Sequence, residues 1–233
     1  MNLYDTIFKR RSVRHFDMRP LNPDLLSQIN GYIANVKQID NIDKAHFNLV
    51  DEKMTTGGIR TPHYFLASGQ DGQGACINAG FALAELDLYL QSKGFGSIFL
   101  GFTKPIQKSD KTGFIISFGF GNSTVPLRKS ADDFKRLPIN TISNIDNSIT
   151  QTARIAPSAV NSQPWFINYQ PGKITIDYHG RGILKLALKK KMSMVDLGIV
   201  TKFIEIALQH ENKTVESINV NTGKNVSIEI TFK

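Results

Sequence analysis

Two long apolar stretches that resemble each other constrain the fold more than any other feature of this sequence. The residues from Ala75 to Lys93 are apolar on nearly every side of a helix, which predicts a buried central helix. A second long apolar helix is predicted from Met194 to about His210. The two stretches match at an offset of 118 residues, and the matched positions are Asn78 with Asp196, Gly80 with Gly198, Asp87 with Glu205, Leu90 with Leu208 and Gln91 with Gln209.

An offset close to half of the 233-residue chain predicts an internal repeat. We therefore divide the chain into residues 1–138 and residues 139–233, two similar halves that each hold a long helix and several strands. Apolar runs bounded by turn residues predict these strands at 45–50, 62–68, 97–102, 114–121, 166–169, 173–178, 217–220 and 226–232.

The first half carries a basic corner after its opening helix. Arg10, Arg11, Ser12 and Arg14 cluster where that short helix is predicted to end. Cations suit the negative end of a helix dipole, so a capped helix with a solvated basic end is one interpretation. The other is a phosphate clamp, because arginine forks grip phosphate oxygens and a serine hydroxyl adds a further bond.

The second half carries a stiff polar loop over residues 156–165, Ala-Pro-Ser-Ala-Val-Asn-Ser-Gln-Pro-Trp. Its prolines end the preceding helix, and its short polar side chains offer hydrogen bonds to a flat polar ligand. The first half has Lys37–Asn41 where such a loop would stand, and the second half has no arginine motif ahead of its helix. Each half therefore lacks the feature that the other supplies.

Two further positions are candidates for ligand contact. Gly101 ends an apolar strand and would let a ligand approach the backbone, although an ordinary strand-to-loop turn explains it equally. Arg128 and Lys129 form a second basic cluster, far from the first in the sequence. The glycine-rich stretch 69–74 matches neither a dinucleotide fingerprint nor a P-loop.

Composition excludes several classes of function. The net charge is +8, but the basic residues lie in separate groups without interleaved aromatics, which favours a phosphorylated small molecule over nucleic acid. Cys76 is the only cysteine and the five histidines are scattered, so neither a disulfide nor a metal site is expected. No membrane-spanning run and no signal peptide is recognised, which predicts a cytoplasmic protein with no membrane partner.

Together these motifs resemble the nitroreductase family of FMN-dependent NAD(P)H flavin oxidoreductases, in particular an internally duplicated, thermophile-type branch. The resemblance rests on Arg10-Arg11-Ser12-Val13-Arg14, on the loop 156–165, on the helix start at Asp196, on Phe99-Leu100-Gly101, and on Gly119-Phe120-Gly121 with Arg128-Lys129 downstream. It implies an α+β nitroreductase-like fold, a three-layer α/β/α sandwich with mixed sheets and central helices.

The resemblance also implies a composite FMN site. Carried over residue by residue, Arg10, Arg11, Ser12 and Arg14 would hold the phosphate and the polar edge of FMN, and Arg128 or Lys129 would add to the phosphate grip. The flavin would be lined by Pro157, Ser158, Ala159 and Asn161 from the other side. The backbone N–H of Gly101 would point at flavin N5, next to Leu100, where the family usually has an acidic residue.

The order of the motifs departs from the usual family pattern, because more than 140 residues separate Arg14 from Pro157. The repeat accounts for this departure if the chain is a fused pseudo-dimer that keeps one composite site. We therefore expect one FMN per chain, in a monomeric pseudo-dimer or in a homodimer of it.

The implied reaction is a ping-pong transfer of a hydride from NADH or NADPH, through flavin N5, to a small nitroaromatic, quinone or similar acceptor. The alternative is a non-catalytic flavin-binding protein, a store or a sensor, on the same fold. The sequence leaves open the physiological acceptor and the choice between NADH and NADPH.

Overall fold

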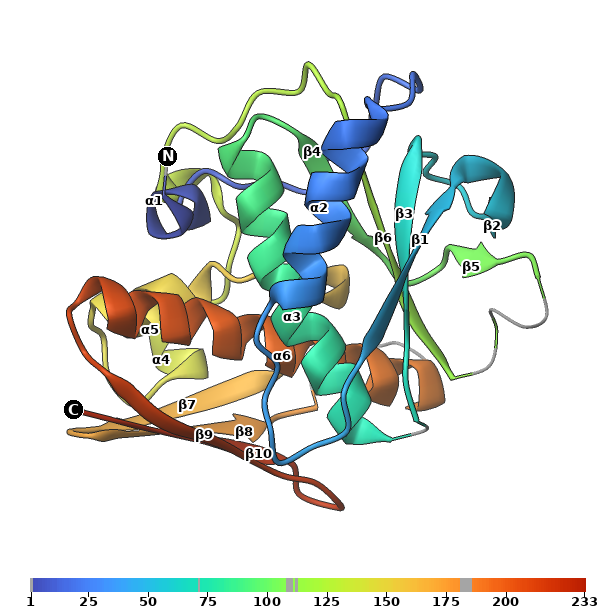
Figure 1. The fold of residues 1–233 in the computed structure, drawn as a ribbon. Coiled ribbons are helices and arrows are strands. Elements are labelled where there is room, and N and C mark those ends of the chain that lie inside the picture. The colour runs from blue at the N-terminus through green and yellow to red at the C-terminus, as the bar shows by residue number, and fades with distance from the viewer. Residues whose placement is uncertain (1, 71, 108–110, 112, 181–185) are drawn as a thin grey trace.

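Two four-stranded sheets with two long helices between them make up the fold (Figure 1). The computed structural model describes residues 2–70, 72–107, 111, 113–180 and 186–233. The long helices are α3 (Gln73–Ser92) and α6 (Leu186–His210), and they cross each other at the centre of the molecule (Figure 1).

The two sheets have the same strand order. The first is ordered β1-β3-β6-β4, with β1 at His46–Asp51, β3 at His63–Ser68, β6 at Phe114–Gly121 and β4 at Gly96–Leu100. The second is ordered β7-β8-β10-β9, with β7 at Trp165–Gln170, β8 at Lys173–Tyr178, β10 at Ser227–Phe232 and β9 at Val215–Asn221. In the first sheet α3 connects β3 to β4, and in the second sheet α6 connects β8 to β9. Each long helix therefore leads from the second strand of its sheet's order to the fourth, so the connectivity of the first half recurs in the second.

Shorter elements surround this framework. The helices are α1 (Leu3–Ile7), α2 (Pro23–Asn35), α4 (Ile139–Ile142) and α5 (Ser148–Arg154). Single 3-10 turns occur at Glu52–Met54, Ala131–Asp133 and Ala159–Asn161, and β2 (Thr55–Thr56) pairs with β5 (Lys104–Pro105). Asn22 caps α2, because its side chain accepts a hydrogen bond from the Asp24 N–H at 2.8 Å.

The crossing of α3 and α6 is reciprocal. A Cβ atom added to Gly80 would lie 1.9 Å from the carbonyl oxygen of Val195, and one added to Gly198 would lie 1.9 Å from that of Ile77. Val195 and Ile77 are themselves matched positions of the repeat. The glycines let the two backbones approach more closely than any larger residue would allow, and this fixes where the helices cross.

The buried side chains form one large core and one small cluster. The large core surrounds α3 and α6 and extends to the inner faces of both sheets. The small cluster, Tyr64, Ile98 and Leu100, lies against Phe16, Val50 and Ile59. Alternation of buried and half-exposed residues along β8 and β10 shows that the second sheet has one core face.

Two details differ from the sequence-based expectation. The long helices lie between the two sheets, so the layer order is not that of an α/β/α sandwich (Figure 1). All pairings between the described strands are antiparallel, so the sheets are not mixed, and parallel pairing is limited to the single bridges Ser12–Ser97 and Ser143–Ile167. Neighbouring strands in each sheet run in opposite directions, as in a β-hairpin, and the long helix lies on one side of the sheet.

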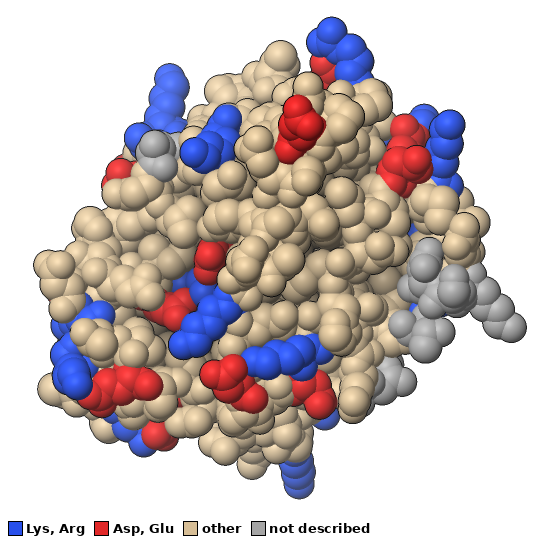
Figure 2. All heavy atoms as spheres, viewed as in Figure 1, with Lys and Arg blue, Asp and Glu red and all other residues tan. Residues whose placement is uncertain are grey.

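Charge is mixed on the face seen in Figure 2, where blue and red side chains lie side by side over the second sheet. The ion pairs of the described residues include Lys173 with Glu229 and Lys213 with Glu211, each at 2.5 Å. Exposed pairs of this kind contribute little to stability.

Candidate functional site

A cavity of about 440 Å³ brings together three segments that are far apart in the sequence. Ser12 and Arg14 come from the basic corner, Leu100 is the last residue of β4, and Gly101 follows it. The remaining predicted site residues on its wall come from the polar loop and are Pro157, Ser158 and Ala159. This volume falls in the range of ordinary small-molecule sites, so the structure joins seven of the predicted residues in one place.

The polar loop is held by buried side-chain hydrogen bonds. Gln163 accepts from the Leu137 N–H at 2.7 Å and donates to the Arg154 carbonyl at 2.9 Å, and its own N–H donates to Ser158 Oγ at 2.9 Å. Asp196, at the start of the apolar part of α6, accepts from the Ala159 N–H at 2.9 Å. These bonds fix the loop against the cavity.

The loop also stores backbone strain. Val160, Asn161 and Gln163 have φ values of 49°, 58° and 45°. Positive φ is especially unfavourable for a β-branched residue such as Val160, which lines the cavity and is 65% exposed. Strain of this kind is concentrated at binding and catalytic sites.

The basic corner is buried at Arg10, half-buried at Arg11 and Ser12, and exposed at Arg14. Arg10 is 1% exposed, and its Nε lies 2.7 Å from Oδ2 of the buried Asp87. An NH2 group of Arg10 donates to Ser12 Oγ at 3.3 Å, which connects the guanidinium to the cavity wall. The corner lies beside β4 because Ser12 forms a parallel bridge with Ser97 and the Val13 N–H donates to the Ser97 carbonyl at 3.1 Å. The interpretation as a solvated helix end is therefore wrong for Arg10.

Further arginines gather around Arg10. Arg128 donates to the Arg10 carbonyl oxygen at 2.5 Å and lies over the Phe134 ring at 4.3 Å. Burial lowers the pKa of Arg128, and the positive charges of Arg10, Arg11 and Arg14 lower it further against the opposing effect of Asp133. Around Arg128, the positive charges of neighbouring arginines therefore outnumber the negative charges of neighbouring carboxylates.

Arg136 belongs to the same group, although sequence reasoning did not assign it to the site. Burial, followed by the charges of Arg10, Arg128 and Arg154, lowers its pKa to about 10. Its Nε is buried without a hydrogen-bond partner among the described residues. A buried donor without a partner is costly, and an anion bound in this cluster would satisfy it. No sequence signal marked Arg136, because its neighbourhood depends on long-range folding.

Five predicted residues do not line the cavity: Arg10 and Arg128, described above, and Arg11, Lys129 and Asn161. Arg11 donates from its backbone to Gln91 Oε1 and from its side chain to the Pro126 carbonyl, each at 2.8 Å. Lys129 is exposed, and its backbone N–H donates to Asp133. Asn161 is exposed and uses its amide to accept from Arg136 and to donate to the Lys135 carbonyl. Asn161 therefore contacts the arginine cluster instead of lining the cavity, because positive φ values turn this part of the loop outward.

Gly101 does lie on the cavity wall, but the space beside it is filled. A Cβ atom at this position would lie 2.9 Å from Sδ of Met192, which is buried and also lines the cavity. The glycine thus accommodates Met192 of α6 as well as any ligand. Phe102, the next residue, is 72% exposed on the cavity rim, and its open position offers apolar surface to a ligand.

Asp196 is the second site residue that sequence reasoning did not assign, although the repeat had singled out its position. It is 3% exposed and lines the cavity, and its Oδ2 is buried without a hydrogen-bond partner among the described residues. Burial raises the pKa of Asp196 to about 8, against the opposing effect of the Ala159 N–H. Only contact between α6 and the loop produces this environment.

The described residues contain no cluster of three or more side chains suited to a metal ion. None of the helices that the structure describes has both the length and the apolar character needed to cross a bilayer.

Comparison with known proteins identifies the family and the fold. A family model described as "Putative TM nitroreductase" matches residues 2–208. The crystal structure of a "putative nitroreductase" from Thermotoga maritima MSB8 superposes with a TM-score of 0.71 at 20% identity, covering 99% of this chain and 94% of that chain. A nitroreductase family protein from Clostridium difficile 630 gives a TM-score of 0.48 at 15% identity, covering 60% of this chain and 96% of that chain.

No curated protein matches the chain. At 20% identity, the similarity to the Thermotoga maritima structure shows a shared α+β fold. The family model extends over most of the sequence and includes the basic corner, the polar loop and α3. The chain therefore belongs to the nitroreductase family, a family of oxidoreductases.

Proposed function

We propose that this protein is an FMN-dependent oxidoreductase that passes electrons from NADH or NADPH to a small nitroaromatic, quinone or similar acceptor. The observation that carries the proposal is the single cavity shared by Ser12 and Arg14 with Pro157, Ser158 and Ala159. The two halves of the motif set, separated by more than 140 residues, meet there.

The residues present fit FMN at both of its ends. The cavity walls include Ile98, Leu100, Ile116, Val195 and Ile199, which suit a flat apolar ring system. Ser12 connects this cavity to the cluster of Arg10, Arg128 and Arg136, whose mutual repulsion and unpartnered Arg136 Nε favour a phosphate. Without a bound anion, the repulsion between these arginines would be offset less.

The flavin, when bound, supplies the electron-transfer chemistry between nicotinamide and acceptor. The protein's contribution is to orient and to shield. Arg14 places a positive charge on the cavity wall, which favours negative charge on a ligand there. Phe102 and Val160 are exposed on the rim and offer apolar surface to an aromatic acceptor.

We also propose that the chain is a fused pseudo-dimer with one FMN site. The equal strand order of the two sheets and the reciprocal contacts of Gly80 and Gly198 support the duplication. In the first half, residues 37–41 border a separate, more polar cavity of about 680 Å³ that also includes Glu205. Lys37 and Lys213 line that second cavity, but none of the arginines of the described chain does. The lack of an arginine fork there supports a single phosphate-binding site per chain.

The absorbance spectrum of the purified protein tests the proposal, with flavin counted per chain. We expect a yellow protein with one FMN per chain, bleached by NADH or NADPH and recoloured by a quinone or nitroaromatic. A yellow protein that no nicotinamide bleaches would favour the alternative of a flavin store or sensor. A colourless protein that takes up no FMN would overturn both, and salt-sensitive binding to DNA or RNA would then indicate a nucleic-acid binder.

A further inference from the structure

Asn78 of α3 and Asp196 of α6 perform the same structural task in the two halves. The Ile39 N–H donates to Asn78 Oδ1 at 2.8 Å, and the Ala159 N–H donates to Asp196 Oδ1 at 2.9 Å. Both residues are buried, and they are matched positions of the repeat. Each therefore anchors the loop that precedes the first strand of its own sheet.

The two side chains differ in their second polar atom. The amide nitrogen of Asn78 donates to the carbonyl oxygens of Ile39 and Asp43, each at 3.0 Å, so the amide is fully used. Oδ2 of Asp196 is buried without a partner among the described residues, and Asp196 lines the cavity. The first half shows that a neutral amide is sufficient to hold such a loop. The carboxyl group at position 196 adds an oxygen that can bind and release a proton.

We propose that Asp196 holds a proton at the cavity wall and donates it to an oxygen atom of the bound electron acceptor as that acceptor is reduced. This inference rests on the proposed function, since it assigns a residue to the acceptor half of that reaction. Among the described residues on the cavity wall, Asp196 has the only carboxyl group. Leu100, where the family resemblance would place an acidic residue, cannot supply a proton.

The protonation state of Asp196 supports this assignment. Because burial raises its pKa to about 8, the side chain is mostly neutral at pH 7 and carries the proton that it would donate. A neutral carboxyl also costs less to bury than a charged one, which explains how the group persists on a largely apolar wall.

None of the described charged groups on α6, or on the elements that contact it, forms an ion pair with Asp196. Arg14 shares the cavity wall with it, and Asp5 of α1 is exposed. The other charged groups among the described side chains of these elements and of α6 have partners. The pairs are Glu85 and Glu205 with Lys202, Asp87 with Arg10, Arg154 with the Leu137 carbonyl, Lys191 with the Phe114 carbonyl, Lys173 with Glu229, Asp177 with Asn168, and Glu216 with Lys233. Lys190 is exposed.

The step balances for a quinone. The acceptor gains a hydride equivalent that NADH or NADPH ultimately supplies, and one carbonyl oxygen takes the proton from Asp196. The products are a hydroquinone and the Asp196 carboxylate, which recovers its proton from water after the product leaves. For a nitro group the same hydride and proton give a nitroso group and water.

The experiment compares the wild-type holoprotein with Asp196→Asn, which keeps an oxygen to accept the Ala159 N–H, as Asn78 does for Ile39. Asp24→Asn makes the same chemical change at an exposed position of α2 and serves as the control. Reduction by NADPH and reoxidation by a benzoquinone are followed separately by stopped-flow absorbance. We expect Asp196→Asn to slow reoxidation about 100-fold or more, and to leave FMN stoichiometry and reduction by NADPH within about twofold.

A second readout does not depend on turnover. Infrared difference spectra of the flavin-free protein, recorded across a pH titration, should show a protonated carboxyl band in the wild type at pH 7. The band should disappear as the pH rises past about 8 and should be absent from Asp196→Asn. This readout, and the fall of the wild-type reoxidation rate over the same pH range, test the proposal even if the variant does not fold.

Two outcomes would overturn the inference. The first is reoxidation of Asp196→Asn at the wild-type rate, and the second is a wild-type protein without a titrating carboxyl band. Failure of the proposed function is distinguishable, because it would appear as absence of FMN binding or of bleaching by NADPH in the wild type itself.

Discussion

Nε of Arg10 lies 2.7 Å from Oδ2 of Asp87, and the two side chains are 1% and 0% exposed. Oδ1 of the same carboxylate accepts from Ser97 Oγ at 2.6 Å and from the Gln91 amide at 2.8 Å. Asp87 thereby connects the basic corner to α3 and to β4 in one buried network. The position of the corner relative to the cavity is set by this network.

Replacing Asp87 with alanine should strongly destabilise the protein. The change leaves the Arg10 charge buried without its partner, which costs about 3–5 kcal/mol for a buried ion pair. Urea unfolding of the flavin-free protein measures the loss of free energy of unfolding. Asp132→Ala, at an exposed position, should change it by less than about 0.5 kcal/mol. A loss below about 1 kcal/mol at Asp87 would show that this pair does not hold the corner.

Gly198→Ala should disrupt the crossing of the central helices. The added Cβ would lie 1.9 Å from the carbonyl oxygen of Ile77, so backbone must shift, and we expect a loss of about 3 kcal/mol or more in the free energy of unfolding. Gly31→Ala is the matched control, since Gly31 is also helical but has no atom within 4 Å of the added Cβ. That variant should gain about 0.5–1 kcal/mol. Equal thermal shifts for the two variants would contradict the close crossing.

Arg136→Ala should weaken FMN binding through the phosphate. Loss of one charge-assisted contact costs about 1.5–3 kcal/mol, which raises the dissociation constant about 10- to 100-fold. Riboflavin has no phosphate, so its affinity should stay within about threefold. Fluorescence titration of flavin-free protein with the two flavins measures both constants.

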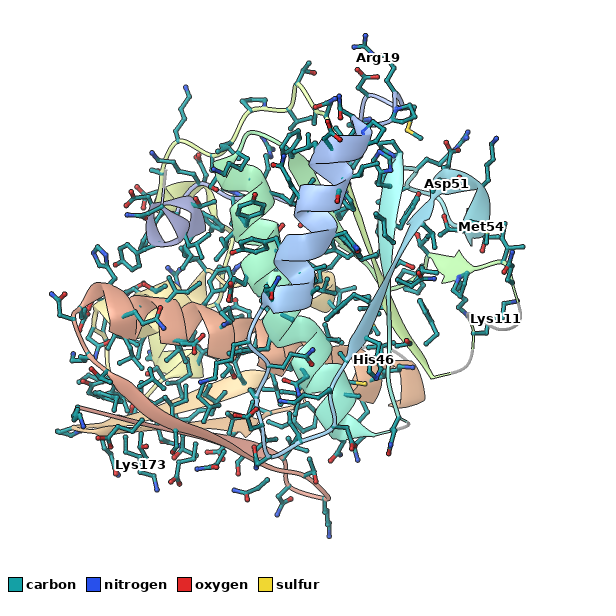
Figure 3. All side chains as sticks on the ribbon, viewed as in Figure 1. Arg19, His46, Asp51, Met54, Lys111 and Lys173 are labelled. Carbon is teal, nitrogen blue, oxygen red and sulfur yellow. The ribbon has the colours of Figure 1, made fainter. Side chains whose placement is uncertain are left out.

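The control for Arg136 is Arg19→Ala. Arg19 lies on the segment ahead of α2, points away from the body of the molecule (Figure 3), is 86% exposed and is paired with Asp17. Its removal should change neither affinity. If Arg136→Ala weakens FMN and riboflavin equally, the arginine acts on the loop rather than on the phosphate.

The free energy of unfolding should depend on pH through Asp196. Its pKa is raised to about 8 in the folded protein, so between about pH 4 and pH 8 the folded state binds this proton more tightly than the unfolded chain does. The stabilising contribution is therefore present at low pH and decreases as the pH rises through that window, by up to about 1.4 kcal/mol per pH unit.

The difference between wild type and Asp196→Asn isolates this contribution, because the other titrating groups are common to both. Urea unfolding from about pH 5 to about pH 8 should show the wild type losing stability relative to the variant. A difference that stays constant over this range would mean that Asp196 is ionised in the folded protein.

Much of the framework followed from local sequence pattern. The apolar runs located all eight strands of the two sheets to within two residues at most of their ends, because alternation and turn residues act over short distances. The helix over 75–93 was predicted to within two residues, whereas α6 begins at Leu186, eight residues before the predicted Met194. The basic residues ahead of Met194 hid that first part of α6, since they interrupt its apolar pattern.

The sequence by itself determined the two central helices and the motifs that place this chain among nitroreductases, because these depend on residue type and spacing. Tertiary structure alone decided the surroundings of the candidate site residues: it placed Arg136 near Arg10, left Asn161 exposed and buried Asp196 at the cavity wall. These outcomes depend on contacts between segments far apart in the chain, where burial and neighbouring charge set the chemistry of a group. The polar loop and the basic corner are each recognisable alone, but only the folded chain brings them to the wall of one cavity.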